Sequence, residues 1–139
     1  MRDDTTPPAW LTEYISLWMG RLGVQDWHVH VAVVTRIVEY PKADGLCETY
    51  PEINRADLSF LVGIEDCAED RIKVIHELLH VLHGRIDSTV ERVVLPAIPE
   101  AAQEMAASAY RLVYESYIHQ LAVSLWRLAE GEEEGNDAP

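Results

Sequence analysis

Two histidines and a glutamate stand close together in the segment His76-Glu77-Leu78-Leu79-His80. Residues four apart lie on one face of an α-helix, so the imidazoles of His76 and His80 can reach a common metal ion. Neutral imidazole nitrogens are ligands that suit Zn²⁺. Glu77 follows the first histidine and points toward the open coordination position, where its carboxylate can take a proton from a zinc-activated water. The spacing therefore predicts a hydrolytic zinc centre, with Zn²⁺ as the cofactor and Glu77 as the catalytic base.

The helix predicted around this motif has a start signal, a stop signal and apolar surroundings. Asp66 and Glu69 have the spacing of a capping box, and Gly84 is a typical helix terminator. The apolar neighbours of the motif, which indicate a buried helix, are Leu78, Leu79, Val81 and Leu82. Polar groups buried without partners cost free energy, so two imidazoles and a carboxylate on such a helix favour metal binding over a chance match.

The segment from Val74 to Leu82 resembles the active-site helix of the zincin superfamily of metallopeptidases. The wider chain is similar to small bacterial and phage-encoded members such as the ImmA/IrrE and SprT-like groups, in which a first helix and a few strands precede the motif helix. The resemblance implies hydrolysis of a peptide or protein substrate, with His76 and His80 as zinc ligands and Glu77 as general base. It also implies that an edge strand before the motif helix, here residues 56–62, pairs with the extended substrate.

A catalytic zinc usually has three protein ligands, and the third one is the least certain part of the pattern. Glu115 is the preferred candidate because it lies in the apolar segment 112–118, where a buried carboxylate is costly unless it is paired or bound to metal. His83 is seven residues after His76, about 10 Å along a regular helix axis, which is too far to share the metal. The remaining candidates for the third ligand are Glu104, Glu100, Glu91 and Asp87.

Other polar residues have ordinary explanations beside the functional ones. Three tyrosines near Glu115 are candidates to polarise the substrate carbonyl, although each could equally pack an amphipathic helix: Tyr110, Tyr114 and Tyr117. His83 and His119 are alternative helpers. His119 stands four residues after Glu115, where similar families often place an acidic residue. The strand histidines His28 and His30 are interpreted as solvated residues and not as metal ligands.

Hydrophobic periodicity predicts an α+β domain. A first helix should follow a Thr6 N-cap and end near Gly20 and Gly23. The further elements expected are strands at 27–34, 46–50 and 56–62, the last near a sheet edge because Asp57 and Ser59 face outward, and helices at 66–84, 88–95 and 100–129. Together with this pattern, the resemblance implies a small zincin-like domain with an N-terminal helix, a short twisted sheet of about three strands, the motif helix and a long C-terminal helix. We expect one domain over residues 1–129 and an acidic disordered tail over 130–139.

Composition limits the partners. The 139 residues suffice for one ordinary domain, and 11 basic against 24 acidic residues give a net charge of −13. Such an acidic chain is poorly suited to nucleic acid or to anionic membranes, so a basic or neutral substrate or partner is more natural. Cys47 and Cys67 lack CxxC spacing, and the N-terminal segment lacks an apolar export core, so a cytoplasmic location is expected. The oligomeric state is left open.

Two other functions compete with an active peptidase. A catalytically inactive zinc-binding module with the same fold could regulate or bind a partner, but it would have no need of Glu77. A purely structural helical protein could carry the motif by accident. Bound metal would distinguish this structural protein from the peptidase and from the zinc-binding module.

Overall fold

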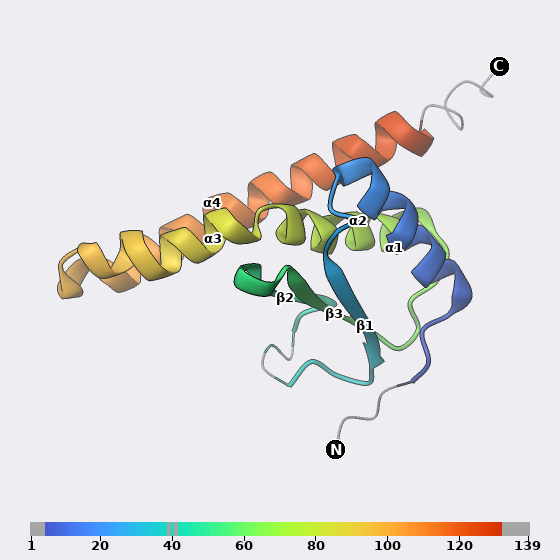
Figure 1. Cartoon of the computed structure of the whole chain (residues 1–139), viewed down its shortest axis with the longest axis horizontal. Coiled ribbons are helices and arrows are strands. Elements are labelled where there is room, and N and C mark those ends of the chain that lie inside the picture. Colours follow the sequence, from blue (N-terminus) through green and yellow to red (C-terminus); the bar gives the residue numbers. More distant parts are fainter. Residues whose placement is uncertain (1–4, 39, 41, 132–139) are drawn as a thin grey trace.

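The computed structural model describes residues 5–38, 40 and 42–131 of the chain. Over these residues it has an α+β architecture, which confirms the predicted broad class (Figure 1). The helices are α1 (Ala9–Leu22), α2 (Ala68–Leu82), α3 (Gly84–Thr89) and α4 (Glu100–Trp126), and the strands are β1 (His28–Val34), β2 (Gly45–Tyr50) and β3 (Arg55–Leu61). None of the described helices is both long and apolar enough to cross a membrane.

The sheet has the strand order β1-β3-β2, with β1 parallel and β2 antiparallel to β3. The prediction that residues 56–62 form an edge strand is therefore wrong, because β3 is the central strand. Its Leu58 and Phe60 are fully buried, while Asp57 and Ser59 lie half-buried on the other face. The alternation of polar and apolar residues identified the solvent face of the sheet, and this face was mistaken for its edge. The edge strands are β1, to which Thr5 pairs at Val33, and β2.

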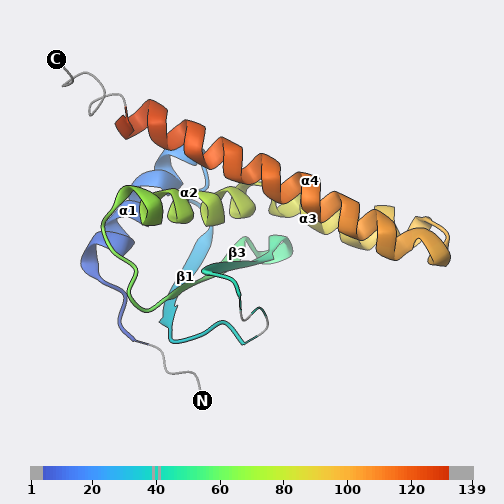
Figure 2. The ribbon, with the colours of Figure 1, turned by 180° about the vertical axis from the view of Figure 1, so that it is seen from behind.

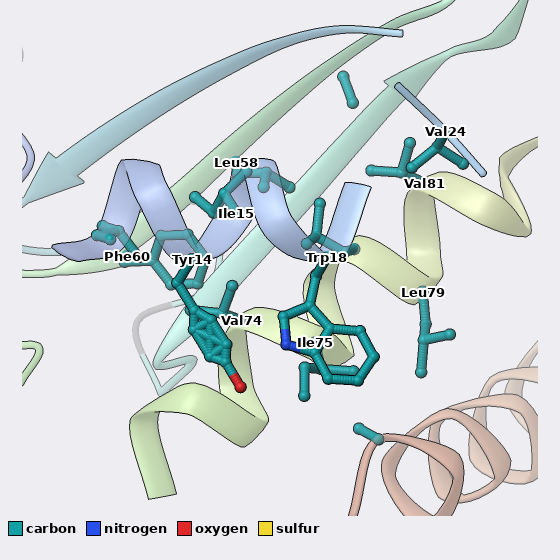
Figure 3. Close-up of a cluster of buried hydrophobic side chains, with 14 of the residues drawn as sticks. Tyr14, Ile15, Trp18, Val24, Leu58, Phe60, Val74, Ile75, Leu79 and Val81 are labelled. Carbon is teal, nitrogen blue, oxygen red and sulfur yellow. The ribbon is translucent and has the colours of Figure 1, made fainter. Parts of the chain in front are cut away.

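The hydrophobic core lies between the sheet and the helices (Figure 3). α1 contributes residues at helical spacing, including Leu11, Ile15 and Trp18, and α2 contributes Ile75 and Leu79. α1 ends at Gly23, whose φ of 73° is favourable only for a residue without a side chain. The motif helix α2 is thus held between the sheet, α1 and α4, which restricts the positions of its polar side chains.

Both predicted N-terminal caps are absent. α1 starts after Pro8, and neither Pro8 nor any other residue forms a side-chain cap there, so Thr6 is not the N-cap. α2 starts after Cys67, and Asp66 instead accepts a hydrogen bond from Arg71 at 2.6 Å. Proline already holds a φ suited to helix entry, and an arginine one turn away competes for the carboxylate that sequence spacing assigned to the backbone.

Gly84 does not end the helical segment. The helix is interrupted at His83 and resumes at once as α3, which continues through a π-helical turn (Val90–Val94) and a 3₁₀ turn (Leu95–Ala97). The predicted helix at 88–95 is part of this run. Gly84 is buried because the chain passes close to β2: an added Cβ would lie 3.1 Å from the Cβ of Thr49. Close packing, and not helix termination, accounts for glycine at this position.

The long helix α4 runs back along α3 and α2 (Figures 1 and 2). Only part of its predicted apolar side is buried: Ile118 and Ala122 lie in the core, whereas Leu112 and Val113 are 75% and 70% exposed. The N-terminal half of α4 extends beyond the sheet together with α3. α4 continues into a π-helical turn (Arg127–Gly131).

The start of the predicted acidic tail is ordered helix. Glu130 accepts a hydrogen bond from the Tyr14 hydroxyl at 2.6 Å and forms an ion pair with Arg71. These contacts tie the end of α4 to α1 and α2. The rest of the predicted tail, residues 132–139, lies outside the described residues.

Candidate metal centre

His76 and His80 lie side by side on the face of α2 that is turned toward α4. Their ring centroids are 5.0 Å apart, and their Nε2 atoms are 3.3 Å apart. This is the arrangement expected of residues one helical turn apart on a helix whose other faces are occupied by the core. Both side chains are partly accessible, so an ion or a water molecule can reach their ring nitrogens.

Glu115 of α4 lies directly opposite the two histidines. Its Oε2 is 3.1 Å from Nε2 of His76, and its Oε1 is 3.1 Å from Nε2 of His80. The buried Ile118, one turn further along α4, fixes the helix against α2 and so holds Glu115 at this position. The side chain of Glu115 is 53% exposed, so the burial that was expected from the sequence is wrong even though the residue lies at the site.

The distances among these three residues match the requirements of a zinc ion. Donor atoms about 2.0–2.1 Å from a tetrahedral zinc are roughly 3.3 Å from one another. Here the Nε2 atoms of His76 and His80 are 3.3 Å apart, and each lies 3.1 Å from a different carboxylate oxygen of Glu115, so the four atoms form a group of about this size. Two imidazoles and one carboxylate form a donor set used by catalytic zinc sites, which leave a fourth position open. His76, His80 and Glu115 thus fit a zinc ion in chemistry and in spacing.

The charges of Glu115 and His80 stabilise each other. Hydrogen bonds with His76 and His80 hold the pKa of Glu115 well below its usual range. Burial opposes protonation of His80, but the hydrogen bond with Glu115 and the negative charges of Glu77, Glu115 and Asp87 outweigh it, and the pKa of His80 is raised. Without metal the carboxylate is therefore ionised and attracts positive charge to the point between the rings. A divalent cation bound at this point would compete with the proton that otherwise binds to His80.

Glu77 is the one buried charged residue among those described, with an exposed fraction of 8%. Burial raises its pKa, the charges of His80 and His76 partly oppose this, and that of Glu115 adds to it. A carboxylate with a raised pKa is a stronger base, which suits a group that must take a proton from water near neutral pH.

Gly45, the first residue of β2, forms part of the wall around Glu77. A Cβ at this position would lie 3.1 Å from Oε1 of Glu77. If Glu77 acts as a general base, Gly45→Ala should displace its carboxylate slightly and lower the rate of hydrolysis about tenfold, since small misplacements of a catalytic group cost one to two orders of magnitude. Zinc content should stay unchanged.

The matched control for this variant is Gly20→Ala, on the exposed surface of α1, where an added Cβ meets no atom within 4 Å. Alanine is the better helix former, so this variant should keep full activity and melt slightly higher. Steady-state peptide hydrolysis and thermal melting of the two variants, measured together, give the comparison. Equal activity of both variants would show that Gly45 does not position Glu77.

A cavity of about 880 Å³ lies beside His76, His80 and Glu115, which form part of its lining. It is bounded by β2, α2, α3 and α4, so the centre lies in its wall. The candidate residues that line this cavity are His76, Glu77, His80, Asp87, Glu91, Tyr114, Glu115 and His119. β2 contributes Gly45, Leu46 and Cys47, and the sequence had no signal that this strand would lie beside the motif helix.

The other predicted candidates for the third ligand lie elsewhere. Asp87 and Glu91 line the cavity but are not part of the donor group, and neither Glu100 nor Glu104 is among its lining residues. His83 is not part of the donor group: its Nδ1 donates a hydrogen bond to the carbonyl oxygen of Leu79 at 2.8 Å, and its ring packs edge-on against Tyr114 and Tyr117. The spacing argument against His83 thus agrees with its position.

The aromatic candidates separate into two groups. The ring of Tyr114 meets that of His80 edge-on at 5.4 Å, and the ring of His119 lies 6.0 Å from that of His76. Tyr110 stacks on Tyr114 at 5.3 Å, and Tyr117 packs on His83; neither lines the cavity among the described residues. The strand histidines His28 and His30 are exposed on β1 and line a different hollow beside α1.

Comparison with known proteins places the chain in no family: no protein-family model, no curated protein and no solved structure matches it.

Proposed function

We propose that this protein is a zinc-dependent hydrolase, and more specifically a peptidase, in which His76, His80 and Glu115 hold the ion. The observation that supports this most strongly is the meeting of two imidazoles from α2 with one carboxylate from α4: one ligand atom of each residue lies within 4.8 Å of the other two. Two histidines and a glutamate are the ligand set of one class of catalytic zinc site.

Glu77 supplies the base in this proposal. A bound zinc ion would act as a Lewis acid toward water and toward the substrate carbonyl. The buried Glu77 carboxylate, one residue from the ligand His76, would accept a proton from the attacking water and transfer it to the leaving amine nitrogen. The helix fixes the position of Glu77 relative to both histidines, so no rearrangement is needed before the proton transfer.

β2 is the strand that we propose to bind the substrate, in place of residues 56–62. β3 is paired on both sides, but β2 has one free edge and its first three residues line the cavity. An extended peptide can add to a free strand edge through main-chain hydrogen bonds, which brings its carbonyl groups close to the metal centre. Tyr114 and His119, which also line the cavity, are the candidates to polarise the scissile carbonyl.

The assignment of Glu115 as third ligand predicts a loss of zinc affinity in Glu115→Gln. A neutral amide is a much weaker zinc ligand than a carboxylate, so we expect the dissociation constant to rise by at least the 10- to 100-fold that supporting residues of zinc sites account for. Competition with a chromophoric chelator measures it, and zinc-dependent cleavage of unfolded casein should fall in parallel.

The matched control is Glu104→Gln, which makes the same change in charge on the same helix outside the cavity. It should bind zinc as the unaltered protein does. If Glu115→Gln and Glu104→Gln had the same zinc affinity, Glu115 would not be a ligand, and the proposed centre would lack its third donor.

A further inference from the structure

The cavity extends past the metal centre along α3 to two carboxylates that the proposed chemistry does not use. Asp87 and Glu91 follow His80 by seven and eleven residues, close to whole numbers of helical turns, so they continue the face that carries the histidines. Helical hydrogen bonds persist across the interruption at His83, from His83 N to Leu79 O and from Asp87 N to His83 O, both at 3.0 Å. Asp87 therefore lies about 10 Å along the axis from His80.

Asp87 is half-buried beside an aromatic wall. The rings of Tyr110 and Tyr114 are stacked, and both hydroxyl groups are buried. Burial, and after it the charge of Asp87 and a hydrogen bond to its carboxylate, raises the pKa of Tyr110 to about 12, which places that hydroxyl next to Asp87. The Asp87 carboxylate and the ring of Tyr114, which both line the cavity, together form an environment that would attract a cation.

The charges that line the cavity are unevenly matched. Near α2, Lys73 is already paired with Asp44 at 3.3 Å and with Asp70 at 3.3 Å. Near α3, Arg111 is the one cationic residue of the described lining, against the two carboxylates Asp87 and Glu91. An excess of negative charge remains at this end of the cavity, and the chain as a whole carries −13. Such a field concentrates cations from solution.

We propose that the α3 end of the cavity is a specificity pocket for a lysine or arginine side chain of the peptide substrate, with Asp87 as the principal recognition residue and Glu91 as its support. This inference rests on the proposed function, because the metal centre defines where the scissile bond lies. A separation of about 10 Å between the metal-binding residues and Asp87 is suited to a long, unbranched basic side chain from a residue near the scissile bond. A shorter or uncharged side chain would leave the half-buried carboxylate without a charged partner, and this favours a basic side chain.

The test compares peptides that differ only in charge. N-acetylated, C-amidated hexapeptides of alanine and glycine carry either one lysine or one norleucine, which has a similar aliphatic stem but no charge. Binding is measured by titration calorimetry with zinc-loaded Glu77→Gln protein, so that no peptide is consumed. We expect the lysine peptide to bind roughly ten- to a hundredfold more tightly, as for charge pairs between partly exposed and buried positions.

Three variants assign the preference to the pocket. Asp87→Asn should reduce it to less than threefold, and Asp87→Glu, which retains the charge, should preserve most of it. Glu104→Gln, with the same charge change as Asp87→Asn but outside the cavity, should leave it intact. Circular dichroism checks that Asp87→Asn is folded. If it folds poorly, Glu91→Gln, at the supporting carboxylate of the cavity wall, takes its place: it should lower the lysine preference, and an unchanged preference would overturn the pocket.

Equal binding of the two peptides, no binding of either, or an equal loss of preference in Glu104→Gln and Asp87→Asn would overturn the specificity pocket. Failure of the proposed function has a different signature. If the lysine preference is present but the unaltered protein cuts neither peptide nor casein, the cation pocket stands and hydrolysis does not. If peptides are cut without regard to charge, the proposed hydrolysis stands and the cation pocket does not.

Discussion

Glu77→Gln is expected to abolish peptide hydrolysis while zinc remains bound. Glutamine has nearly the same shape and fits the buried position of Glu77, but it cannot accept a proton. Glu77 is not among the three donor residues, so the metal site keeps its ligands. Because general-base catalysis contributes about 10²- to 10⁴-fold, we expect the rate with casein or a fluorogenic peptide to fall by at least a factor of a hundred. Zinc content is measured on the same preparation.

The control for this variant is Glu100→Gln, which removes one carboxylate at the exposed start of α4, outside the cavity. It should hydrolyse peptides at the unaltered rate. Equal rates for Glu77→Gln and the unaltered protein would show that Glu77 is not the base. A different result, one zinc per chain but no cleavage of any peptide library by the unaltered protein, would favour the inactive zinc-binding module instead.

Zinc is expected to raise the melting temperature of the metal-free protein substantially. A ligand that binds only the native state, at a hundred times its dissociation constant, stabilises that state by about 2.7 kcal/mol. For a chain of this size, 2–4 °C per kcal/mol gives a rise of roughly 5–10 °C. The expected increase is favoured further because the ion would bridge α2 and α4, which otherwise meet through exposed polar groups at this point.

His80→Ala should eliminate this rise, since it removes one of the three donors. The matched control is the double variant His28→Ala/His30→Ala, which removes two exposed histidines of β1 and should keep the full effect. Scanning calorimetry with and without zinc gives both values. The same rise in His80→Ala as in the unaltered protein would mean that zinc stabilises the fold from another site.

The sequence predicted the local elements well where periodicity was strong. The motif helix, the long C-terminal helix and the alternating strands are all present. Burial of one face gives each element a regular spacing of apolar residues, and one or two exceptions do not remove that spacing. The helix boundaries were less accurate. The caps assigned to Thr6 and Asp66 are absent, since capping spacing is common and the backbone found other partners.

Tertiary placement could not be read from the pattern in the same way. Glu115 was selected because an apolar neighbourhood suggested burial, yet it is half-exposed, and what brings it to the histidines is the packing of Ile118 and Ala122 against α2. The central position of β3 and the approach of β2 to Glu77 depend on strand order, which short alternating segments do not encode. The end of the cavity at Asp87 likewise depends on the packing of α3 beside α4, which the sequence pattern does not encode.

The convergence of His76, His80 and Glu115 on one zinc ion is tested most directly by elemental analysis of the purified protein. The chain is expressed without added metal, equilibrated with micromolar zinc and freed of excess by gel filtration, beside the variant His76→Ala/His80→Ala. We predict one zinc per chain in the unaltered protein and less than a tenth of that in the variant. The absence of zinc from both, or an equal content in both, would contradict the account.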